Sequence, residues 1–251
     1  MTRFVPSQLT LAPLALATAL ALSLTACGGD DKKSGPAPST PAGTTPAPSV
    51  TSSTPSETPG EPVTRTAAEL TKALLVLSDL PTGFTLEKDA PDDNTKPFSS
   101  PSSRCKTLVK YLNAIKAPGS KASVSRSFSG GQEGPYIDFG LDSMGTAEKV
   151  ADLQGTYEDA ADSCSNLTLK AEGEGSTSMK VEKITAPRFG TGPFALRLTG
   201  TSGPKRGLEY TAATTGVNDV IVSVGVLAGQ GELDAATEAA VTKAQQVLKT
   251  A

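Results

Sequence analysis

A stretch that cannot form a packed core divides this chain into parts. Between Gly28 and Thr64 the sequence holds eight prolines among serine, threonine, alanine and glycine, with no apolar periodicity. Such a segment cannot bury enough apolar surface to offset the entropy lost on ordering. We therefore predict a disordered tether over residues 27–64 and a single globular domain over residues 65–251. A proline-rich docking motif and a glycosylated Thr/Ser stalk remain open as alternative uses of the tether.

The residues before the tether are apolar. Arg3 supplies one positive charge, and residues 9–26, LTLAPLALATALALSLTA, carry no charge. A basic start, an apolar core and small residues at the end are typical of a secretory signal peptide, here residues 1–26. The alternative is an uncleaved membrane helix. This run is short for a membrane span, contains Pro13, and is followed by no basic cluster that would stop transfer.

The end of the predicted signal peptide carries a more specific pattern. Leu24-Thr25-Ala26-Cys27 resembles the lipobox of bacterial lipoprotein precursors. The resemblance implies diacylglyceryl transfer to the Cys27 thiol and cleavage before it, with the protein anchored on the extracytoplasmic face of the cell membrane. The chemistry suits these residues, since a thiolate is the strongest nucleophile that a side chain offers.

The cysteine count agrees with this interpretation. Three cysteines are an odd number for an exported protein. If Cys27 carries the lipid, only Cys105 and Cys164 remain, and an oxidising compartment favours a disulfide between them. Closing this loop contributes up to about 4 kcal/mol in the chain-entropy model. Two buried free thiols are the alternative.

The composition excludes several function classes. There is no histidine, which removes Ser-His-Asp and Cys-His catalysis and His-ligated zinc. The formal net charge is −3, and no cluster of Lys and Arg marks a nucleic-acid interface. We expect no cofactor, no metal, no nucleic-acid partner and no catalytic residue.

Periodicity divides the globular region into helices and strands. Thr66-Ala-Ala-Glu69 has the spacing of a capping box, and Leu70, Leu74 and Leu77 fall on one helical face before Pro81. Residues 89–101 are predicted as a polar loop. Further helices are predicted near 102–117, over 144–163 and near 232–249, and strands near 84–86, 121–128, 135–142, 167–171, 179–181, 194–198, 208–212 and 220–227.

The order of these elements predicts an α+β fold. Residues 220–227 are almost all apolar, which indicates a central strand covered on both faces. The other strands alternate and are joined by short turns, which favours an antiparallel sheet with helices packed against one face. About 190 residues can bury roughly 70% of the surface of the unfolded chain. Aromatic residues are sparse, so we expect a core of Val, Leu, Ile and Ala.

The pattern resembles that of the PknH-like extracellular sensor domains of actinobacterial membrane kinases and their lipoprotein relatives. It rests on Leu77-Ser-Asp-Leu-Pro-Thr-Gly-Phe84, on the helix-borne Cys105, on the Phe128-Ser-Gly-Gly131 turn and on Cys164. The resemblance covers about residues 65–250. It implies a helix-decorated antiparallel sheet with a cleft that senses a ligand, and no catalytic residues.

Other short motifs favour ordinary structural roles. Ser103-Arg-Cys-Lys106 and Ser202-Gly-Pro-Lys205 fit S-x-x-K, the nucleophile motif of penicillin-recognising enzymes, but the companion motifs are missing. A helix cap beside a surface lysine is the simpler interpretation. Four oxygen-bearing side chains crowd one loop without EF-hand spacing, and a solvated turn is favoured there: Asp89, Asp92, Asp93 and Asn94.

Two functions from different classes therefore remain. The domain binds a small apolar or envelope-derived ligand in a site between the sheet and a helix, or it docks another envelope protein without a small-molecule site. A hydrolase that uses carboxylates or a Ser-Lys pair ranks third. The sequence assigns no ligand-binding residue.

Overall fold

The computed structural model describes residues 62–88, 96–171, 173–229 and 231–249. The predicted signal peptide, Cys27 and nearly all of the predicted tether lie outside the described residues, as do Asp89, Asp92, Asp93 and Asn94. The described residues therefore cover most of the predicted globular domain.

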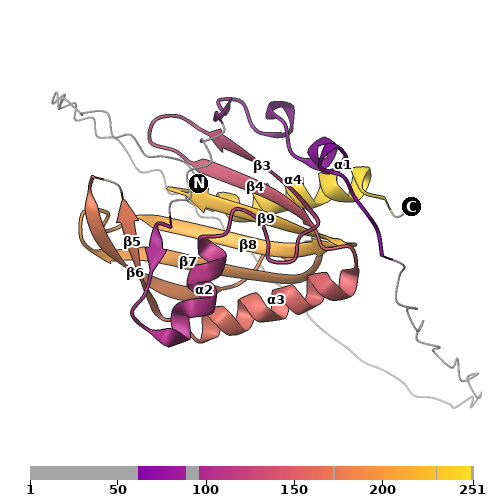
Figure 1. The fold of residues 1–251 in the computed structure, drawn as a ribbon. Coiled ribbons are helices and arrows are strands. Elements are labelled where there is room, and N and C mark those ends of the chain that lie inside the picture. The colour runs from indigo at the N-terminus through magenta and orange to yellow at the C-terminus, as the bar shows by residue number, and fades with distance from the viewer. Residues whose placement is uncertain (1–61, 89–95, 172, 230, 250–251) are drawn as a thin grey trace, which may run out of the picture. The chain divides into compact units, whose positions relative to one another are not determined.

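A nine-stranded antiparallel sheet runs through the described residues in the spatial order β1-β3-β4-β9-β8-β7-β6-β5-β2 (Figure 1). The predicted α+β fold built on an antiparallel sheet is confirmed, and so is the central place of β9. Only the two-residue strand β2 falls where the sequence predicted a polar loop. The strands are β1 (Thr85–Leu86), β2 (Phe98–Ser99), β3 (Ala122–Ser129), β4 (Tyr136–Ser143), β5 (Asn166–Ala171), β6 (Gly175–Ile184), β7 (Thr191–Ser202), β8 (Glu209–Val217) and β9 (Val220–Leu227).

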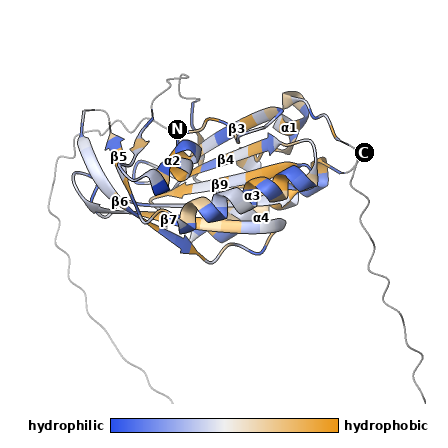
Figure 2. Ribbon diagram, turned by 60° about the horizontal axis from the view of Figure 1, so that its bottom comes forward, coloured by the Kyte–Doolittle hydropathy of each residue, from blue (hydrophilic) through white to orange (hydrophobic). Residues whose placement is uncertain are grey.

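Helices pack on both faces of the sheet, so the prediction of one covered face is wrong. α1 (Ala67–Ala73) and α4 (Glu232–Val247) lie against one face, and α2 (Lys106–Leu112) and α3 (Ala147–Asp162) lie against the other (Figures 1 and 2). The valines at even positions of β9 pack with α1 and α4, whereas Ile221 packs with α3. This double burial explains the nearly continuous apolar sequence of β9.

The larger core lies between the sheet, α1 and α4, and it is mainly aliphatic as predicted. Phe128 and Phe139 are its fully buried aromatic residues, with ring centroids 5.8 Å apart in an edge-to-face arrangement. A second core on the other face brings α2 and the end of α3 against β5, β6 and β7, around Leu108, Met179 and Leu198. Both cores fix the two helix pairs relative to the strands between them.

The first helix is shorter than its apolar spacing predicted. The capping box is present: Thr66 accepts from the Glu69 backbone N–H, and the Glu69 carboxylate accepts from that of Thr66. The helix ends at Ala73, because the backbone of Leu74 is extended and turns both Leu74 and Leu75 into the core. Leu77, expected on the buried face, is 46% exposed in a 3₁₀ turn over Leu77–Asp79.

The second helix is also shorter than predicted. It ends at Leu112 because the side chain of Asn113 forms hydrogen bonds with the backbone of Phe98. Asn113 Oδ1 accepts from Phe98 N–H at 3.0 Å, and Asn113 Nδ2 donates to Phe98 O at 2.7 Å. These bonds place Phe98 beside β5, where it pairs with Leu169. Ile115, expected on the inner helical face, is 70% exposed in the loop after the helix.

The chain enters the domain at one end of the sheet. Val63 N–H donates to Gly145 O at 2.8 Å, in the turn between β4 and α3. Arg65 then forms an ion pair with Asp219 in the β8–β9 turn, with Nη2 2.7 Å from Oδ1 and side chains that are 10% and 3% exposed. Ser143 Oγ donates to the other Asp219 oxygen at 2.9 Å. We call these contacts the entry clamp.

Candidate functional site

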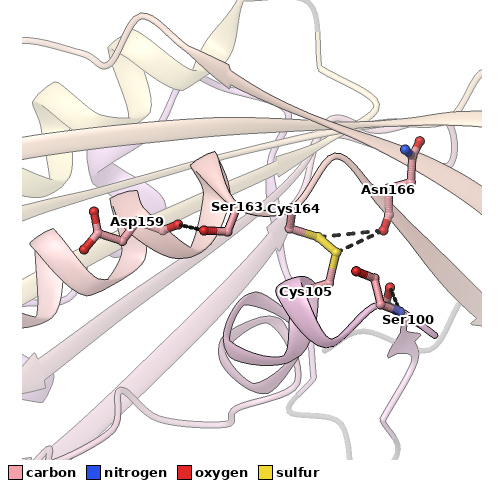
Figure 3. The surroundings of a disulfide bond; sticks show 7 residues. Ser100, Cys105, Asp159, Ser163, Cys164 and Asn166 are labelled. Atoms are coloured by element: carbon pink, nitrogen blue, oxygen red, sulfur yellow. Dashed lines mark hydrogen bonds between the residues drawn. A yellow bond between two sulfur atoms is a disulfide. The ribbon is translucent and has the colours of Figure 1, made fainter.

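The two cysteines that the sequence leaves for pairing form a disulfide that joins the start of α2 to the end of α3 (Figure 3). Cys105 and Cys164 are both buried, and their sulfurs contact the carbonyl oxygen of Asn166 at 3.4 and 3.7 Å. Ser163 ends α3 with its Oγ donating to Asp159 O at 2.8 Å. The disulfide is a packed part of the second core.

The two S-x-x-K matches lie in different parts of the fold. Ser103 and Lys106 line an open surface depression of about 270 Å³ beside Ser100 and Val109, and the Lys106 backbone N–H donates to Ser103 O in the 3₁₀ turn before α2. The Lys205 ammonium pairs with the Glu174 carboxylate. Among the residues that the structure describes, no three side chains of the metal-binding types converge.

The α2–α3 face of β3, β4 and β9 carries a set of small and polar residues that we call the polar strip. Two cross-strand rows form it, Ser125–Gly140–Ser223 and Ser127–Asp138–Gly225. Residues at alternating positions of the same strands pack in the opposite core, as the pleat requires: Phe128, Ile137, Phe139, Leu141, Val222, Val224 and Val226. The polar strip and the larger core therefore lie on opposite faces of the same strands.

The polar strip is partly open to solvent although β4 and β9 are central strands. α3 packs mainly across β6 to β9, so the outer strands of this half extend beyond it (Figure 2). Ser125 is exposed, and Ser127, Asp138, Gly140 and Ser223 are partly exposed. The hydroxyl and carboxylate groups of the strip can therefore meet a ligand while the strands that hold them stay fixed.

A tyrosine hydroxyl stands over one row of the strip. A Cβ built on Gly225 would lie 2.4 Å from Tyr210 Oη, so only glycine admits the phenol there. Gly225 is the cross-strand partner of Asp138, whose carboxylate accepts a hydrogen bond from Ser127 Oγ. Burial, and then the nearby negative charge of Asp138, raise the pKa of Tyr210. Ser127, Asp138 and Tyr210 thus bring a hydroxyl, a carboxylate and a phenol to the same place.

A second carboxylate lies further along β4 on the same face. Asp142 is 6% exposed and accepts a hydrogen bond from Ala117 N–H at 3.0 Å, with the hydroxyls of Ser120 and Ser123 as further partners. Burial raises the pKa of this carboxyl, against the hydrogen bonds and the nearby Lys116 charge that lower it. Asp142 lies four positions after Asp138, which is about 13 Å along a strand.

Two tyrosines from the helices complete this end of the site. The rings of Tyr111 in α2 and Tyr157 in α3 meet edge to face with centroids 4.5 Å apart. Burial raises the pKa of Tyr157, and the charge of Asp142 and the presence of Tyr111 raise it further. Perturbed ionisable groups that gather beside a partly exposed surface are typical of functional sites.

The strands predicted from the sequence rested on their apolar positions alone, and these do not reveal this site. On β4, Ile137, Phe139 and Leu141 pack in the larger core, while Asp138, Gly140 and Asp142 lie on the other face. The informative signal was the coincidence of serines, aspartates and glycines at alternate positions of three strands that also pair.

No helix within the described residues is long and apolar enough to span a membrane.

Comparison with known proteins reveals similarity in fold. No protein-family model matches the chain, and no curated protein matches it. A solved structure, the extracellular domain of PknH from Mycobacterium tuberculosis, matches with a TM-score of 0.55 and 16% sequence identity, over 76% of this chain and 99% of that chain. The resemblance to extracellular sensor-like domains predicted from the sequence is therefore confirmed at the level of the fold.

Proposed function

We propose that this chain is a lipid-anchored lipoprotein whose globular domain binds an envelope-derived ligand on the extracytoplasmic side of the membrane. The observation that carries the binding role is the polar strip: central strands keep one face partly exposed and line it with hydroxyls, a carboxylate and a phenol. A face meant only for packing is lined with apolar residues, as the opposite face of the same strands is.

Two independent features support the proposed location. The lipobox pattern at Leu24–Cys27 implies export and a lipid on Cys27. The fold is similar to that of a protein domain described as extracellular. A fold alone does not assign a function, so the binding role rests on the site and not on that similarity.

Binding rather than catalysis fits the chemistry of the site. The chain has no histidine, the commonest general base near neutral pH, and Ser103 and Lys106 lie in an open surface depression. Asp138 and Asp142 are separated by about 13 Å along β4, further than paired carboxylates that act on one bond. We propose that the partly exposed Asp138 holds the ligand, whereas Asp142 is buried and bonded within the protein.

The test uses the full chain in detergent, incubated with lipid and glycan extracts of a bacterial envelope. A component that binds raises the midpoint of thermal unfolding. At a hundred times its dissociation constant, it increases the free energy of unfolding by about 2.7 kcal/mol. Ser223→Val fills the strip with a residue that strands favour and should abolish the stabilisation. Ser178→Val, the same change at an exposed position of β6, should preserve it. Equal stabilisation of both variants would refute the proposed site.

Docking of an envelope protein is a second candidate, favoured by one observation. Val76 and Leu77 are consecutive apolar residues with exposures of 40% and 46%, on the side of the molecule that α1 and α4 cover. Leu77→Ser should then weaken capture of a defined envelope partner without changing the thermal midpoint. Loss of extract-induced stabilisation in that variant would instead place the ligand on the α1–α4 side.

A further inference from the structure

The hydrogen-bonding groups of the polar strip favour one class of ligand. The inference that follows rests on the proposed binding function. We infer that the strip binds a neutral polyhydroxylated ligand, that is, an uncharged glycan.

The groups of the strip match hydroxyls that both donate and accept. Asp138 accepts only, whereas Ser127, Ser223 and the Tyr210 phenol can each donate and accept. Ser127 already donates to Asp138, which leaves the other lone pairs of the carboxylate for hydroxyls of a ligand. Charge-assisted bonds from sugar hydroxyls to a carboxylate are short and strong, and they fix the orientation of a ring.

Gly140 leaves room for a ring to lie on the strands. It presents no side chain to this face, and a Cβ built there would approach only the Cβ of Ser223, at 3.7 Å, whereas the Tyr210 phenol already covers Gly225. Tyr210 stands beside this floor, and Tyr157 and Tyr111 lie toward Asp142. Tyrosine offers an apolar face together with a polar tip, which suits a sugar ring with its C–H face and its hydroxyl rim.

The charge of the strip disfavours anionic and apolar ligands. Its ionisable group is Asp138, and the second carboxylate of the same face is Asp142. Arg126 of β3 belongs to the opposite face and donates to Leu75 O at 2.6 Å, while Lys116 lies near Asp142. An anionic ligand would meet uncompensated negative charge at Asp138, and an apolar ligand would bury that carboxylate without partners. A neutral ligand rich in hydroxyls incurs neither cost.

The test measures binding of the full chain in detergent to neutral hexasaccharides built from glucose, galactose, mannose, arabinose or N-acetylglucosamine, with hexagalacturonate as the anionic comparison. Titration calorimetry should detect at least one neutral hexasaccharide and should not detect hexagalacturonate. Asp138→Asn and Ser223→Val should each weaken that binding by about tenfold or more. Asp152→Asn on the exposed side of α3 and Ser178→Val should leave it unchanged, and thermal midpoints check that every variant is folded.

The outcomes separate the ligand class from the binding function. If envelope extract stabilises the chain and Ser223→Val removes the effect, but no neutral hexasaccharide binds, the glycan inference is overturned and the binding site stands. Preferred binding of hexagalacturonate, or unchanged hexasaccharide binding by Asp138→Asn, overturns it as well. If no extract stabilises the chain, the proposed function fails together with the inference.

Discussion

Asp142 is nearly fully buried beneath the loop that joins α2 to β3, and burial raises the pKa of its carboxyl. A raised pKa means that the folded protein holds this proton more tightly than the unfolded chain does. The ionised carboxylate therefore costs stability, and the cost is fully present above the folded pKa and absent below the unfolded one. A residue that lowers stability beside an open polar surface is typical of a functional site.

We predict that Asp142→Asn stabilises the domain by about 1 kcal/mol at pH 7, because the amide oxygen still accepts from Ala117 while the buried charge is removed. The gain should shrink as the pH falls through the raised pKa and vanish below the ordinary aspartate pKa of 3.8, where Asp142 is protonated in both states. Urea denaturation at several pH values measures this. A gain that is equal at all pH values would show that the charge is not its cause.

The ion pair of the entry clamp is of a different kind, since Arg65 and Asp219 satisfy each other in a buried place. Arg65→Ala should cost about 3 kcal/mol, because it leaves the Asp219 carboxylate buried without its cation. Lys180→Ala is the matched control. Lys180 forms an ion pair with Glu182, and the two side chains are 53% and 41% exposed. Loss of this exposed pair should change the free energy of unfolding by less than about 1 kcal/mol. Equal effects of the two substitutions in urea denaturation would contradict the structural role of the clamp.

At the scale of elements, the disulfide holds α2 against α3. α2 has seven residues, too few to be stable alone, and it is fixed by Cys105, Leu108 and the bonds of Asn113. The replacement of Cys105 and Cys164 together by alanine should destabilise the domain by up to about 4 kcal/mol, since the bridge closes a sequence separation of 59 residues.

Hydrogen exchange locates the effect of that double replacement. We expect exchange to increase first in α2 and at the end of α3, while β4, β8 and β9 keep their protection until global unfolding. Increased exchange spread evenly over the sheet would show that the bridge supports the whole fold and not this corner.

The elements predicted well from the sequence are those with a strong local pattern. β9 was predicted as a central strand because its apolar run is continuous, and α3 and α4 because their spacing extends over several turns. α1 and α2 end early for tertiary reasons: Leu74 and Leu75 both enter the core, and Asn113 bonds a distant strand. β2 has no pattern of its own, since Phe98 is extended only through its pairing with Leu169. The second helix-covered face was missed because amphipathic periodicity does not reveal which side of a sheet a helix occupies.

At the scale of the whole molecule, the proposal requires that the domain be held at a membrane. Expressed in a bacterium that processes lipoproteins, the full chain should fractionate with membranes, and Cys27→Ser should release it or halt its processing. Two acyl chains suffice for stable anchoring, at about 0.8 kcal/mol per buried CH₂. Membrane association that is unchanged in the Cys27→Ser protein would indicate an uncleaved helix over residues 9–26.

The entry clamp also decides how a mechanical load would reach the domain. A pull on the chain before Val63 acts first on the bond to Gly145 and on the Arg65–Asp219 pair, both in turns at one end of the strands. Asp138 and Gly225 lie several residues further along β4 and β9, in the hydrogen-bonded interior of the sheet. The load path therefore ends at the strand ends and bypasses the polar strip. If the proposed anchor and binding site are correct, tension on the anchor would therefore leave the polar strip and its ligand undisturbed.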